Sequence, residues 1–121
     1  MTIEKILLEA LESGTGVPAY MEVPENPPAS YLILERTGGG EAGHSYRTAT
    51  VAVQSCVGRR EDGGTLLEAA ELNEQVLDIM RDIQYTENRI RQCELNSTYN
   101  YTDTRTKRYR YQAVFDLVYF A

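Results

Sequence analysis

Apolar side chains in the first sixteen residues recur at the three- and four-residue spacing of one helix face. They are Ile3, Ile6, Leu7, Ala10 and Leu11, with charged residues between them. Thr2 suits the N-cap position and Gly14 suits the end of the helix. The pattern therefore predicts a short amphipathic helix at the amino-terminal end.

From there to residue 64 the pattern changes to extended runs separated by proline and glycine. Residues 17–24 predict an edge strand or the entry to a strand, and the prolines of residues 24–30 exclude regular structure. Residues 31–37, YLILERT, predict a strand buried on both faces. Residues 46–57, YRTATVAVQSCV, predict a second strand because they are rich in β-branched side chains. The glycine-rich residues 38–45 are expected to form the flexible loop of this hairpin, and residues 58–64 to end it.

A second helix is predicted from Leu66 to Ile83, because Thr65 and Glu68 match a capping box. Its apolar positions form one stripe along the helix. Acidic residues form another stripe on the opposite side: Glu71, Glu74, Asp78 and Asp82. After this helix, residues 88–101 and 107–120 form two long extended runs joined by TDTRT. Thirteen residues of strand alone reach about 43 Å, so this hairpin must curl or project beyond a domain about 35 Å across.

The last strand alternates between an apolar and a mixed face. Its odd positions are expected to lie under the helices: Tyr109, Tyr111, Ala113, Phe115, Leu117 and Tyr119. Arg108 and Arg110 then point the opposite way, which favours a structural role for the tyrosines over a stacking platform for nucleic-acid bases. The expected fold class is α+β, an antiparallel or mixed sheet with two helices packed on one face and a long C-terminal β-hairpin. All 121 residues form one domain.

Composition narrows the possible functions. The formal charge of −6 disfavours general binding to nucleic-acid backbones, and no apolar run is long enough to span a membrane. Without a signal-peptide pattern, an intracellular chain with free thiols at Cys56 and Cys93 is expected. The single histidine, His44, lies in the glycine-rich loop without an evident catalytic partner. We therefore expect neither enzymatic activity nor a cofactor, and the helical carboxylates alone make a weak metal site.

Charge and aromatic residues instead suggest contact surfaces between subunits. Basic residues gather around the hairpin connection, whereas the second helix carries the acidic stripe, so the two surfaces could pair between neighbouring copies in a closed ring. The alternative is that both are solvated faces. The candidate interface residues are Arg59, Arg60, Glu61, Asp62, Glu71, Glu74, Asp78, Asp82, Tyr99, Tyr101, Arg105, Lys107, Arg108 and Arg110.

The whole layout resembles the tail-terminator and neck-protein group of tailed bacteriophages. The resemblance rests on the short first helix, then VPAYMEVPENPPASYLILERTGGG, then YRTATVAVQSCVGRREDGGTLLEAAELNEQVLDIM, and finally YNYTDTRTKRYRYQAVFDLVYF. It covers nearly the whole chain as an order of elements rather than a fixed motif. One departure is the absence of an aromatic residue between Val51 and Ser55, where such proteins often carry one.

The resemblance implies a ring, typically of six subunits, that caps the finished tail tube and offers its other face to the head connector. Many such proteins are monomeric before assembly. DNA would only pass through the lumen, and the protein would assemble in the bacterial cytoplasm and remain at the head–tail junction of the virion. By position, residues 37–46, residues 58–64 and the hairpin tip would contact tube, head or neighbour. Two alternatives stay open: a head-completion protein of the same neck, and a small-molecule-binding α+β regulatory module.

Overall fold

The computed structural model describes residues 2–120, which form two helices and a five-stranded sheet. In chain order the elements are α1 (Ile3–Thr15), β1 (Ala19–Tyr20), β2 (Ser30–Glu41), β3 (Tyr46–Arg59), the short 3-10 helix η1 (Arg60–Asp62), α2 (Leu66–Thr86), β4 (Ile90–Asn100) and β5 (Arg108–Phe120). The strand order is β1-β2-β3-β5-β4. Only β1 pairs in parallel, with β2, and the other neighbours are antiparallel.

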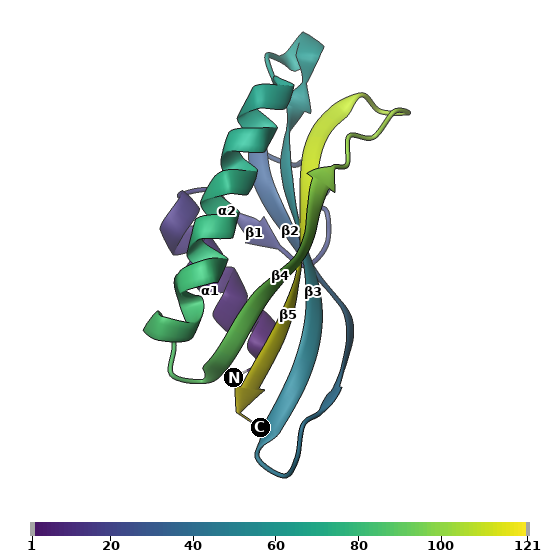
Figure 1. The fold of residues 1–121 in the computed structure, drawn as a ribbon. Helices are drawn as coiled ribbons and strands as arrows, with labels where there is room; N and C mark the ends of the chain where they lie inside the picture. Colours follow the sequence, from purple (N-terminus) through teal and green to yellow (C-terminus); the bar gives the residue numbers. More distant parts are fainter. Residues whose placement is uncertain (1, 121) are drawn as a thin grey trace.

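Both helices lie on one face of the sheet, as predicted for this α+β fold (Figure 1). Contacts between α2 and the sheet fall on β3, β4 and β5, while α1 lies over β1 and β2 and also contacts α2. The other face of the sheet carries no helix (Figure 1). The outer end of the β4–β5 hairpin bends away from α2, so its connection, residues 101–107, lies apart from the helix layer (Figure 1).

The helix boundaries follow their caps. The hydroxyl of Thr2 accepts a hydrogen bond from the backbone N–H of Lys5 at 3.2 Å, and that of Thr65 accepts one from Glu68 at 3.1 Å. The predicted end of α1 at Gly14 is wrong, because the helix continues to Thr15 and ends at Gly16, whose φ of 75° suits glycine. The second helix also continues three residues beyond Ile83.

The glycine-rich segment departs most from its predicted structure. Residues 38–41, expected in a flexible loop, belong to β2 and pair with residues 47–50 of β3. A register shift between Arg36 and Gly38 accommodates them. Residues 31–34 of β2 are buried on both faces, as predicted, but the prediction is wrong for residues 35–37, which are exposed.

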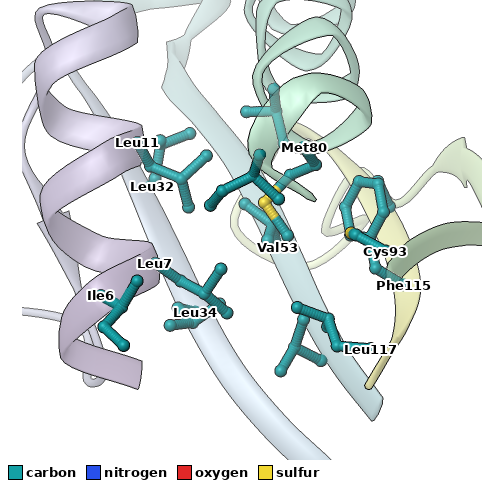
Figure 2. Close-up of a cluster of buried hydrophobic side chains, with 14 of the residues drawn as sticks. Ile6, Leu7, Leu11, Leu32, Leu34, Val53, Met80, Cys93, Phe115 and Leu117 are labelled. Carbon is teal, nitrogen blue, oxygen red and sulfur yellow. The ribbon is translucent and has the colours of Figure 1, made fainter. Parts of the chain in front are cut away.

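The main core lies between the helices and the sheet (Figure 2). Leu7 and Leu11 of α1 and Met80 of α2 pack towards apolar side chains of β2, β3 and β5. In β5 the alternation places Ala113, Phe115 and Leu117 in this core, as predicted. The prediction is wrong for Tyr109 and Tyr111, which are only half-buried and lie outside the cluster.

Candidate interaction surface

The helix-free face of the sheet has a small apolar centre of its own. Tyr31, Ile33 and Cys56 are buried there, and Tyr20 packs against them. The rings of Tyr20 and Tyr31 meet edge to face, with centroids 6.3 Å apart. These side chains lie on this face because successive strand residues point to opposite sides, and their neighbours Leu32 and Leu34 fill the main core.

Beside this centre lies a cavity of about 340 Å³ between the proline-rich segment and the hairpin connection. Apolar side chains make part of its wall, and arginine, glutamine and carboxylate groups make the rest. The lining residues are Val23, Pro24, Glu25, Pro27, Tyr31, Gln54, Cys56, Asp103, Thr106, Arg108 and Arg110. A concave surface with apolar walls and two guanidinium groups suits an anionic group carried on an apolar partner.

Arg110 is held in place by three contacts. Its Nε donates a hydrogen bond to the backbone carbonyl of Tyr101 at 2.6 Å, and one terminal nitrogen donates to Oε1 of Gln54 at 3.4 Å. Its Cζ lies 4.5 Å from the centre of the Tyr101 ring. Arg110 therefore joins β5 to both β3 and the start of the hairpin connection.

Arg108 differs from Arg110 because its guanidinium has no hydrogen-bond partner among the described residues. Its side chain is half-buried and lines both the 340 Å³ cavity and a second cavity of about 270 Å³ beside Asp62 and Glu68. Within residues 2–120 its guanidinium makes no hydrogen bond, ion pair or ring contact. The charge of Arg108 does lower the pKa of Tyr31 and of Cys56, although burial of those two groups raises both pKa values overall.

Two tyrosines share this face with the arginines. Tyr99 and Tyr101 are 42% and 41% exposed, and their rings meet edge to face with centroids 5.9 Å apart. The side-chain amide of Gln112 donates to the Tyr99 hydroxyl at 2.6 Å. Within β5, Arg108 and Arg110 point away from Tyr109 and Tyr111, as predicted, and the prediction did not extend to Tyr99 and Tyr101 of the neighbouring strand. Sequence reasoning had also missed Gln54, Gln112 and Tyr31.

Arg59 at the end of β3 and the two carboxylates of η1 neutralise one another. Arg59 pairs with Asp62 at 3.0 Å and with Glu61 at 3.5 Å, and the hydrogen bond and charge of Asp62 raise the pKa of Arg59. Arg60 instead lines a cavity of about 430 Å³ together with Lys107 and Tyr109. The structure thus brings η1 next to the hairpin connection, although the two are far apart in sequence.

The hairpin connection is a structured turn. The carboxylate of Asp103 accepts hydrogen bonds from the backbone N–H groups of Arg105 and Thr106, at 2.9 and 3.4 Å. The pKa of Asp103 is lowered, mainly by the hydrogen bond from the Arg105 backbone N–H. Lys107 adopts a φ of 62°, the only left-handed non-glycine residue within the described residues. The side chains of Arg105 and Lys107 are exposed.

The acidic stripe lies on the outer side of α2, away from the sheet. Glu71, Glu74, Asp78 and Asp82 are all exposed, and Arg81 pairs with Asp78. Two large apolar side chains follow the stripe at its ends: Leu67 is 67% exposed and Tyr85 is 80% exposed. Neither residue was predicted to be exposed. Leu67 lies four residues before Glu71 and Tyr85 three residues after Asp82, a spacing that places both on the same side of the helix as the stripe.

An apolar groove of about 210 Å³ runs beside the stripe, between α2 and the edge strand β4. Leu77, Met80 and Phe115 line its floor, and Leu95 is half-exposed at its rim. The stripe and the basic hairpin do not touch within one chain: the stripe faces outward from the helix layer, and Arg108 and Arg110 lie on the helix-free face. The structure does not bring the fourteen candidate residues together as one site.

Metal-binding and membrane features can be judged for the described part of the chain. Between residues 2 and 120, no group of three or more His, Cys, Asp or Glu side chains is arranged to hold a metal ion. His44 is exposed in the short connection between β2 and β3. Neither α1 nor α2 has the length and apolar composition needed to cross a membrane.

Comparison with known proteins shows a similarity in fold but none in sequence. No protein-family model matches the chain, and no curated protein matches it in sequence. A solved structure, the virion of a native gene transfer agent particle, contains a chain of similar fold. The TM-score is 0.68 at 13% sequence identity, over 97% of this chain and 91% of that chain. The fold is shared. Because the match spans nearly the full length of both chains, it includes the β4–β5 hairpin as well as the helices.

Proposed function

We propose that this chain is a structural subunit of a virion, and specifically the tail terminator that closes the tail tube as a ring. The observation that carries the proposal is the full-length similarity in fold to a chain from a gene transfer agent virion. The order of elements had suggested tail-terminator and neck proteins independently of that comparison. Both considerations favour assembly rather than chemistry as the role of this fold.

The surfaces of the molecule support a role in assembly. Within residues 2–120, the charged and aromatic groups described above are spread over the hairpin, the helix-free face and α2. They do not converge as a nucleophile, base and oxyanion site would. In the proposed ring, each subunit would contact the tail tube on one face, the head connector on the other face and an identical neighbour on either side. Six copies would form the ring, and DNA would pass through its lumen without being bound.

The test is negative-stain electron microscopy of the purified chain, with and without tail tubes that lack a terminator. Rings at one end of each tube, and an end to further tube growth, are the expected result. Rings that bind portal-bound connectors but not tube ends would assign the chain to head completion instead. If the chain binds neither and a small anion stabilises it in a thermal shift assay, the cavity beside Arg108 belongs to a ligand-binding module.

A further inference from the structure

We propose that the helix-free face around Arg108 and Arg110 receives the acidic outer stripe of α2 from a second copy of this chain. This inference rests on the proposed ring, because it names the contact that would hold neighbouring subunits together. It joins two surfaces on opposite sides of the two-layer domain. One copy cannot satisfy both within itself, so each copy would offer one surface to each neighbour.

The first support is that the Arg108 guanidinium makes no hydrogen bond or ion pair within residues 2–120, although carboxylates of Asp62, Glu68 and Asp103 line the cavities beside it. A half-buried guanidinium without a hydrogen-bond acceptor or counter-ion loses hydration and receives nothing in exchange. Arg108 is in this state within residues 2–120, and it faces a cavity that is large enough for a side chain to enter. Carboxylate is the group that a guanidinium binds best in a protein, through two parallel hydrogen bonds.

The second support comes from α2. Its four stripe carboxylates follow one another at intervals of three or four residues, where like charges repel. Arg81 pairs with Asp78 only. A partner with cations would relieve the repulsion, and the exposed Leu67 and Tyr85 would bury apolar area at either end of the contact.

The spacing of the two sets of charges also agrees. Arg108 and Arg110 are two residues apart on a strand, which separates their Cα atoms by about 7 Å. Glu74 and Asp78 are four residues apart on a helix, which is a rise of about 6 Å. Two guanidinium groups on one copy can therefore meet two consecutive carboxylates on the next. Exposed Tyr99 and Tyr101 lie on the same face as the arginines and would extend the contact.

Because the two surfaces differ, the contact is heterologous and closes into a ring only if each step includes a rotation. A disulfide cross-link tests this directly. Arg81→Cys places a thiol beside the stripe, and Thr106→Cys places one at the rim of the cavity. The native cysteines are both buried and do not compete. The two single variants, mixed under mild oxidation, should give a disulfide-linked heterodimer, whereas each variant alone should give little dimer.

Charge exchange provides the second measurement. Glu74→Lys with Asp78→Lys should weaken self-association about tenfold or more at low salt in sedimentation velocity. Arg108→Glu with Arg110→Glu should do the same, and a mixture of the two double variants should recover association. The matched control for the acidic double variant is Glu9→Lys with Glu41→Lys, which changes the net charge by the same amount on exposed residues outside both surfaces.

The outcomes separate this inference from the proposed function. Homodimers from either single-cysteine variant would show a symmetric contact and overturn the inference. The inference is also overturned if the wild-type chain self-associates but the mixed cysteine variants do not cross-link. It is overturned as well if the wild-type chain stays monomeric at every concentration. If rings still form at tube ends in any of these cases, the proposed function stands with a different contact. Heterodimer formation without tube binding would support the contact and remove the terminator role.

Discussion

The guanidinium of Arg110 lies over the ring of Tyr101, with its Cζ 4.5 Å from the ring centre, and its Nε donates to the Tyr101 carbonyl at 2.6 Å. Tyr101 begins the hairpin connection and Arg110 lies in β5 just after it, so the contact closes the base of that turn. Removing it should free the connection while leaving the core intact.

For Arg110→Gln we expect a free energy of unfolding lower by about 1–2 kcal/mol, from the lost stacking and the lost charged hydrogen bond. Urea denaturation measures this loss. Trypsin should also cleave after Lys107 faster than in the wild-type chain, because the turn opens more often. Arg105→Gln is the control, since the Arg105 side chain is exposed and makes no hydrogen bond within the described residues. Equal cleavage rates in both variants would show that Arg110 does not hold the turn.

The connection between β3 and α2 depends on a close backbone approach at Gly64. A Cβ atom at this position would lie 1.8 Å from the carbonyl oxygen of Gly58. Backbone atoms cannot move aside as a flexible side chain can, so Gly64→Ala should lower the free energy of unfolding by about 2 kcal/mol or more. Gly38→Ala is the control, because nothing lies within 4 Å of its Cβ position. If urea denaturation gave the two variants the same stability, the approach would not be a constraint on the fold.

How far the sequence predicts the structure depends on whether a signal is local. The start of α2 was predicted correctly because the Thr65 cap and the apolar stripe lie within the helix itself. The glycines of residues 38–40 were not recognised as strand. Pairing with the strongly β-forming β3 overrides their low strand propensity, and that pairing is tertiary.

The candidate surface shows the same limit. Simple alternation along β4 would place Tyr99 and Tyr101 on the core side with Cys93. A bulge between Leu95 and Ser97 shifts the register, so Thr98 faces α2, where its hydroxyl accepts a hydrogen bond from Asn73 at 2.9 Å. Tyr99 and Tyr101 then join Arg110 on the helix-free face. Nothing in the spacing of β4 alone predicts this bulge.

Phe115 is the largest fully buried side chain of the core, and it lies beside Cys93 under α2 (Figure 2). Phe115→Ala should lower the free energy of unfolding by about 3–5 kcal/mol, because the lost contacts leave a cavity that the sheet cannot close. The control is Phe120→Ala on the same strand, which should cost about 1 kcal/mol or less because Phe120 is 46% exposed and stacks on Tyr46. If urea denaturation showed similar losses of unfolding free energy for Phe115→Ala and Phe120→Ala, Phe115 would not lie at the centre of the core.

The two buried thiols predict how stability depends on alkaline pH. Burial raises the pKa of Cys56 to about 11, although Arg110 and Arg108 act against it, and raises that of Cys93 to about 12, assisted by Asp116 and Glu94. The ordinary value for these groups is 9.0. Because the folded chain keeps both protons where the unfolded chain releases them, this contribution is fully present below pH 9 and is lost as the pH rises above it.

Each thiol should therefore lower the free energy of unfolding by about 1.4 kcal/mol per pH unit between its unfolded and folded pKa values. Urea denaturation at pH 8 to 10 measures this slope, below the range where the raised pKa of Tyr31 adds to it. The Cys56→Ala, Cys93→Ala double variant should be less stable at pH 8, because two buried side chains are shortened, yet its stability should fall less steeply with pH. The wild-type chain and the double variant could instead lose stability equally steeply with pH. The thiols would then ionise as easily in the folded state as in the unfolded state, so burial would not shield them from water.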